Sequence, residues 1–106
     1  MSKMMTGDVY HAIADPRRRA ILELLGRDEQ PVHDLVSQFD VSFAAISQHL
    51  GVLRDAGLVV RRPDGRSRLY SATPSGLKEV YDWTAQYRDF WRSKIGRLNK
   101  YLDEHP

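Results

Sequence analysis

VSFAAISQHLGVLRDAG, from Val41 to Gly57, carries the strongest structural signal in this sequence. Ser42 is a favourable N-cap residue for a helix, and Gly57 is a residue type that commonly ends one. The apolar residues between them recur at spacings of four and three, which places them on one helical face: Ile46, Leu50 and Leu53. The stretch therefore predicts a helix from Ser42 to about Ala56 with one side buried.

A shorter helix is predicted directly before this stretch. Pro31 opens it, and Asp40-Val41 is a tight connection to Ser42. Its apolar residues are Val32, Leu35, Val36 and Phe39. Two helices of this size joined by about three residues are typical of a helix-turn-helix, which we place at about residues 32–56.

The residues after Gly57 have the character of a β-hairpin. Leu58–Arg62 and Ser67–Ser71 are rich in β-branched and aromatic residues and flank an Asp64-Gly65 turn signal. Residues 61–72 hold four arginines against one aspartate, a net charge of +3, and are the only concentrated positive segment. We predict a two-stranded wing over about 58–72 with arginines at its tip.

The flanking segments are helical by pattern. One helix is predicted at about residues 7–14 and another from Asp15-Pro16 to a C-cap at Gly26. The last segment, about 75–102, has apolar residues at alternating spacings of three and four, and as one helix it would span about 42 Å. The chain of 106 residues has the size of a single domain, 1–106.

These elements predict a mainly α fold with a small β-hairpin, a winged helix-turn-helix of about five helices plus a two-stranded wing. In such proteins the second helix of the motif enters the DNA major groove with its N-terminal residues facing the bases. The favoured wing contacts are the arginines nearest the turn. The candidate DNA-binding residues are Ser42, Phe43, Ala44, Ser47, Gln48, His49, Arg66 and Arg68. His49 also has a structural interpretation, as a partly buried histidine bonded to the backbone.

Three stretches resemble the ArsR family of repressors: VYHAIADPRRRAILELL (9–25), VSFAAISQHLGVLRDAGLV (41–59) and DGRSRLY (64–70). The resemblance covers about residues 8–72 in order and spacing. It implies a homodimer that binds operator DNA and represses transcription, with the first and last helices forming the dimer.

The last helix favours dimerisation independently of this resemblance. Its aromatic stripe is larger than a solvated helix should expose, and pairing with a second copy would bury it. We predict an interface formed by Val9, Tyr10, Ile13, Tyr81, Thr84, Tyr87, Trp91 and Leu98. A pocket for an organic ligand could instead be lined by the aromatic residues Tyr81, Trp83, Tyr87, Phe90 and Trp91. An inducer, either a small molecule or a protein, is left open.

This chain lacks the ligands of the metal sites that are common in the family it resembles. The chain has no cysteine, Pro31 and His33 stand where one site has two cysteines, and residues 75–102 contain no histidine. We therefore expect no metal and no cofactor.

Two other classes of function fit the sequence less well. A winged-helix module for protein–protein contact, without specific DNA binding, leaves the arginine hairpin unexplained. An enzyme is not expected, because the sequence shows no nucleophile elbow, phosphate loop or metal-binding pair. No apolar run approaches the roughly 20 residues of a membrane span, and the N-terminus has no signal-like stretch, so we expect a cytoplasmic protein without a membrane partner.

Overall fold

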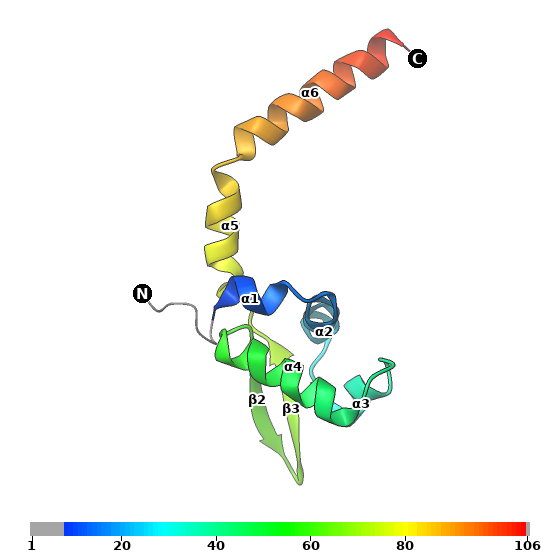
Figure 1. Ribbon diagram of the computed structural model, residues 1–106, viewed down its shortest axis with the longest axis vertical. Coiled ribbons are helices and arrows are strands. Elements are labelled where there is room, and N and C mark those ends of the chain that lie inside the picture. The colour runs from blue at the N-terminus through cyan, green and yellow to red at the C-terminus, as the bar shows by residue number, and fades with distance from the viewer. Residues whose placement is uncertain (1–7, 106) are drawn as a thin grey trace.

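The computed structural model describes residues 8–105 and shows a helical body that carries a three-stranded antiparallel sheet (Figure 1). The elements in chain order are α1 (Val9–Ile13), α2 (Pro16–Arg27), β1 (Gln30–Pro31), α3 (Val32–Val36), α4 (Phe43–Asp55), β2 (Val59–Asp64), β3 (Ser67–Ala72), the 3-10 helix η1 (Pro74–Leu77), α5 (Lys78–Ala85) and α6 (Arg88–Glu104). The predicted fold class, mainly α with a winged helix-turn-helix, is confirmed. The structure adds a sixth helix and a third strand to it.

Side chains cap the helices that form the body. The Asp8 carboxylate accepts from the Tyr10 amide at the start of α1, and Gly7, where this helix was predicted to begin, lies outside the described residues. Asp15 caps α2 and Ser42 caps α4, as predicted. The predicted C-cap at Gly26 is wrong: α2 continues to Arg27, because Gly26 does not adopt the left-handed conformation that a glycine cap requires.

The wing has a slightly different turn from the predicted one. Asp64 still pairs with Ser67, so Gly65 and Arg66 are the two loop residues. Gly65 has φ of 62° and Arg66 does not have a positive φ, which is the pattern of a type II′ turn. β1 pairs with β3 on the other side and makes β3 the central strand.

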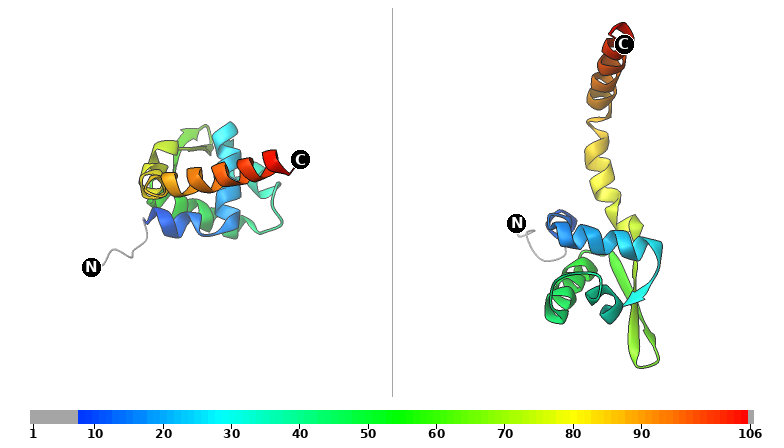
Figure 2. Two further views of the ribbon diagram at one scale, coloured as in Figure 1. Left: turned by 90° about the horizontal axis from the view of Figure 1, so that it is seen from above. Right: turned by 90° about the vertical axis from the view of Figure 1, so that its right-hand side faces the viewer.

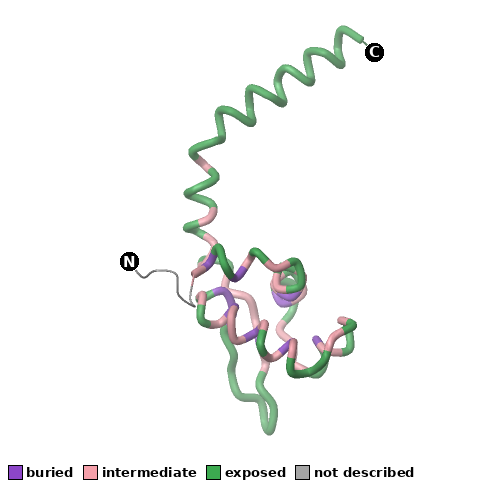
Figure 3. The backbone as a smooth tube through the Cα atoms, in the orientation of Figure 1, coloured by how far each residue is buried: buried purple, intermediate pink, exposed green. Residues whose placement is uncertain are grey.

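The core lies in the helical body and at the base of the wing (Figure 3). Its buried residues are Val9, Ala12, Ile21, Leu25, Leu35, Ile46, Leu50, Leu53, Leu58, Val59 and Tyr70. Neither α5 nor α6 contains a fully buried residue. Burial of α1 to α4 against the sheet therefore fixes the positions of the helix-turn-helix and the wing. It does not fix the position of α5 and α6, which we call the C-terminal arm.

The predicted continuous helix at 75–102 is divided in the structure. α5 ends at Ala85 and α6 begins at Arg88, and the arm bends between them (Figures 1 and 2). The Thr84 hydroxyl donates to the Tyr81 carbonyl and the Gln86 amide donates to the Trp83 carbonyl, so side chains compete with the backbone for these acceptors. The arm gives the molecule its greatest dimension of 61 Å.

Among residues 8–105, no helix is both long enough and apolar enough to cross a membrane.

Candidate nucleic-acid interface

A basic groove lies between the start of α4 and the wing. Its volume is about 660 Å³, and it is lined from three sides by α3 with the residue before it, by one face of α4 and by the wing. The lining residues are Pro31, Val32, His33, Phe43, Ser47, Gly51, Arg54, Arg61, Arg66, Ser67, Arg68 and Tyr70. Four of them are arginines and none is an aspartate or glutamate. The groove therefore favours an anionic ligand such as a phosphate backbone.

The helical repeat of α4 separates its core residues from its candidate DNA contacts. Phe43 and Ser47 line the groove, and the Phe43 side chain is 59% exposed. Ala44 and Gln48 are exposed on the adjacent outer face. Ser42 is also exposed, and its hydroxyl oxygen accepts the Ala45 amide at 3.1 Å. Five of the predicted DNA-binding residues are thus at least partly exposed near the N-terminal end of α4.

His49 is placed differently from these five residues. Its side chain is half-buried and faces the start of α2 rather than the groove. Its Nδ1 lies 3.3 Å from Nη1 of Arg18. The alternative interpretation of a partly buried histidine is right about burial, but the partner of the ring is a side chain and not the backbone.

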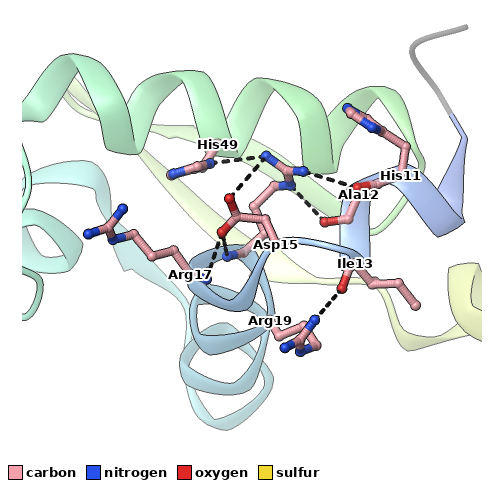
Figure 4. Close-up of polar contacts among 8 residues, drawn as sticks. His11, Ala12, Ile13, Asp15, Arg17, Arg19 and His49 are labelled. Carbon is pink, nitrogen blue, oxygen red and sulfur yellow. Dashed lines mark hydrogen bonds and ion pairs between the residues drawn. The ribbon is translucent and has the colours of Figure 1, made fainter.

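Arg18 makes contacts with three helices that its position in the sequence does not predict. Its side chain is only 11% exposed and joins α1, α2 and α4. It donates to the Ala12 carbonyl at 2.7 Å and to the His11 carbonyl at 3.0 Å, and it lies 4.0 Å from Asp15. Figure 4 shows His11, Ala12, Asp15 and His49 arranged around this one guanidinium. Two features of the sequence could have indicated these contacts. Asp15 and Arg18 are three residues apart, and the carbonyls at the end of the preceding helix need hydrogen-bond donors.

The Asp15 carboxylate has an altered pKa. Partial burial acts to raise it, but hydrogen bonds from the Arg17 and Arg18 amides, together with the positive charge of the nearby Arg18 guanidinium, lower the pKa below its ordinary value. The N-cap is therefore strongest in its ionised form.

Three of the four wing arginines fall into two groups, and the fourth, Arg61, donates to the Tyr70 hydroxyl at 3.4 Å. Arg62 forms a bidentate pair with Glu29, with Nη2–Oε1 and Nε–Oε2 distances of 2.6 and 3.2 Å. This pair lowers the pKa of Glu29 and raises the pKa of Arg62 through the shared hydrogen bonds and charge. Arg66 and Arg68 are exposed and line the groove, and neither has an ion pair with another described residue.

The predicted dimer residues are mostly accessible. Tyr81, Thr84, Tyr87, Trp91 and Leu98 are exposed along α5 and α6. Tyr10 donates through its hydroxyl to the Glu79 carbonyl at 3.2 Å and contacts Trp83 edge-on, so it links α1 to α5. Val9 is only 4% exposed, because it belongs to the core of its own protomer, and this leaves little of its side chain for a partner to cover.

An apolar hollow adjoins the predicted dimer surface. It has a volume of about 420 Å³ and lies where α1, α2, η1 and α5 meet. Its apolar lining includes Ile13, Leu22, Leu77, Val80 and Tyr81. Within residues 8–105, no three histidine, aspartate or glutamate side chains are grouped as metal ligands would be.

Comparison with known proteins identifies relatives over this same region. Residues 15–60 match the family described as bacterial regulatory protein, arsR family. The chain is 46% identical over 68 residues to the HTH-type transcriptional regulator Rv2034 of Mycobacterium tuberculosis, a match that covers 64% of this chain and 64% of that protein, slightly less than two thirds of its length.

Two further relatives extend the match. The transcriptional repressor SdpR of Bacillus subtilis is 31% identical over 80 residues, covering 76% of this chain and 89% of that protein. The crystal structure of the ArsR family transcriptional regulator RHA00566 superposes with a TM-score of 0.69 at 31% identity, covering 79% of this chain and 87% of the other.

Proposed function

This chain belongs to the ArsR family of bacterial regulatory proteins, and from that premise we propose that it is a repressor that binds a palindromic DNA operator as a homodimer. The family consists of transcriptional regulators, so the prediction of a DNA-binding regulator rather than an enzyme is confirmed at that level. The operator, the homodimer and the residue roles below belong to the proposal.

The observation that carries the proposal is the basic groove beside α4. α4 offers Phe43, Ser47 and Gln48 to the bases of a major groove, where glutamine can pair with adenine through two hydrogen bonds. The wing places Arg66 and Arg68 beside the same groove, where they meet the phosphate backbone or the minor groove. The two elements are held together by β2–β3 pairing and the buried residues at the base of the wing.

The exposure of the C-terminal arm, α5 and α6, supports the proposed homodimer. The α6 residues Trp91, Ile95, Leu98 and Leu102 recur at spacings of four, three and four and are all more than half exposed. This is the spacing of a seam between two helices. α6 has no buried residue, and most helical stability in proteins comes from packing of an apolar face, so a second copy that covers the stripe would stabilise α6.

Dimerisation also matches the requirement of the operator. Two recognition helices in successive major grooves must lie about 34 Å apart, and only two protomers supply them. We place the whole arrangement in one domain, with the helix-turn-helix at 32–56, the wing at 58–72 and the dimerisation arm at 75–102. The location is cytoplasmic, where operator DNA is accessible, and the signal that releases the repressor is a small molecule or a protein of unassigned chemistry.

Selection of bound fragments from random duplex DNA tests the proposal. Purified protein should enrich one palindromic sequence, and footprinting should show two protected half-sites about one helical turn apart. Repeating the selection with cell extract would reveal an inducer as lost enrichment. Binding without any sequence enrichment would contradict the proposal and favour a module for protein–protein contact.

A further inference from the structure

Arg18 connects the first helix to the recognition helix through a single guanidinium. Two of its nitrogens donate to carbonyls at the end of α1, those of His11 and Ala12. A third contact reaches Nδ1 of His49 in the middle of α4, 31 positions further along the chain. Because the side chain is only 11% exposed, little water competes for these contacts.

The chemistry of the Arg18–His49 contact fixes the tautomer of the imidazole. A guanidinium has only N–H donors and no acceptor. The Nδ1 atom that faces it must therefore accept, so it carries no hydrogen. A neutral imidazole holds one proton, and that proton must then lie on Nε2. The ring consequently offers an N–H donor on the side away from Arg18.

The position of His49 indicates what this donor meets. His49 follows the exposed Gln48 on α4, but it is itself half-buried, is not among the residues that line the groove between α4 and the wing, and lies beside the start of α2. The walls of a major groove are formed by phosphates, and side chains at the flanks of a recognition helix contact these rather than the bases. A neutral N–H in this position suits a phosphate oxygen.

We propose that Arg18 is a positioning residue for DNA binding, which holds His49 in the tautomer whose Nε2–H donates to a backbone phosphate. This inference rests on the proposed DNA-binding function. The end of α1 has a role as well. The two α1 carbonyls that accept from Arg18 fix the position of the guanidinium relative to His49. A shift of α1 would then change the DNA contact without any movement of the wing.

The first test needs no DNA. Long-range nitrogen–proton NMR of the free protein should show a protonated Nε2 and a bare Nδ1 for His49 while the ring is neutral. Arg18→Met should give a mixture of both tautomers. Arg19→Met is the matched control, because Arg19 also donates to an α1 carbonyl, that of Ile13 at 2.7 Å, and should leave the His49 signals unchanged. A proton on Nδ1 in the wild-type protein would overturn the inference.

The second test separates the two ring nitrogens by substitution at His49 and so does not depend on the folding of an Arg18 variant. Glutamine carries an amide N–H about as far from the backbone as Nε2, whereas asparagine reaches only as far as Nδ1. We expect His49→Gln to bind the selected operator within about threefold of wild type and His49→Asn to bind about tenfold more weakly. The salt dependence should stay unchanged in both variants, since the donor is neutral.

Full binding by His49→Asn would overturn the inference while leaving the proposed function intact. If the wild-type protein bound no DNA, the proposed function itself would fail, and the NMR measurement would still decide whether Arg18 sets the tautomer.

Discussion

Gln48 is the residue on α4 best suited to read a base, because it is exposed next to the groove and its amide both donates and accepts. Gln48→Ala should weaken binding to the operator by about 1–3 kcal/mol and binding to random DNA very little. Titration of both duplexes at one salt concentration measures the difference. An equal loss on both would show that Gln48 only positions the protein.

Asp15 should make stability depend on pH. Its pKa is lower in the folded protein than the ordinary 3.8, so the folded state favours the ionised carboxylate. Its contribution is complete above the ordinary pKa and is lost as the pH falls through the lowered value. Asp15→Ala should cost about 1 kcal/mol at neutral pH, measured by urea unfolding, and this difference should shrink below pH 3.8.

Asp15→Asn is the matched control for this experiment. Asparagine keeps an oxygen that accepts the Arg17 amide but cannot ionise. Its stability relative to wild type should therefore approach equality in acid. A deficit of Asp15→Ala that grows in acid would contradict the lowered pKa.

At the scale of elements, the wing is expected to contribute charge rather than sequence information. Replacing Arg66 and Arg68 by alanine should weaken binding to all sequences and reduce the slope of log K against log salt by about 2, because each phosphate contact contributes about 0.9. Binding measured at several salt concentrations gives the slope.

Arg62→Ala serves as the control for the wing. Arg62 lies on the same hairpin, but its charge is paired with Glu29, so its removal should change the slope much less. An unchanged slope in the double variant would remove the wing tip from the DNA interface.

The packing of η1 against the end of α4 depends on Gly76. A Cβ atom at this position would collide with the Gly57 carbonyl and approach Leu58 Cδ2 to 2.9 Å. Gly57 itself cannot easily yield, because its φ of 77° is set by the turn after α4. Gly76→Ala should lower the free energy of unfolding by about 1–3 kcal/mol.

Gly96→Ala is the matched control for Gly76, since a Cβ atom there meets no atom within 4 Å. In the helical context of α6 it should be neutral or slightly stabilising. Urea unfolding of both variants provides the comparison, and a Gly76→Ala protein as stable as wild type would show that η1 moves aside without cost.

At the scale of the whole molecule, the exposed arm should determine the oligomeric state. Trp91 is 60% exposed and is the first residue of the α6 stripe. Trp91→Glu should yield a monomer in sedimentation velocity, because a buried carboxylate without a partner opposes association. Ser93→Glu adds the same charge on the opposite side of α6 and should remain dimeric. A persistent Trp91→Glu dimer would refute this interface.

The helix-turn-helix and the wing could be predicted from the sequence, because their signals act over a few residues. Ser42 caps α4 three residues ahead of the amide it binds, and Gly65 supplies the positive φ of a two-residue turn. The apolar spacing from Ile46 to Leu53 requires a buried face whichever element covers it. The order of the quoted motifs was likewise sufficient to indicate the family.

Contacts between elements distant in sequence could not be predicted and became evident only in the folded protein. The Arg18–His49 contact joins residues 31 positions apart, and the Arg62–Glu29 pair joins residues 33 positions apart. β1 consists of only two residues and exists because β3 pairs with it. Such contacts depend on how the core orients whole helices and strands, and no local pattern carries that orientation. The charged β2–β3 hairpin could therefore be predicted from the sequence. The position of Arg18 behind α4 depends on how α1, α2 and α4 pack.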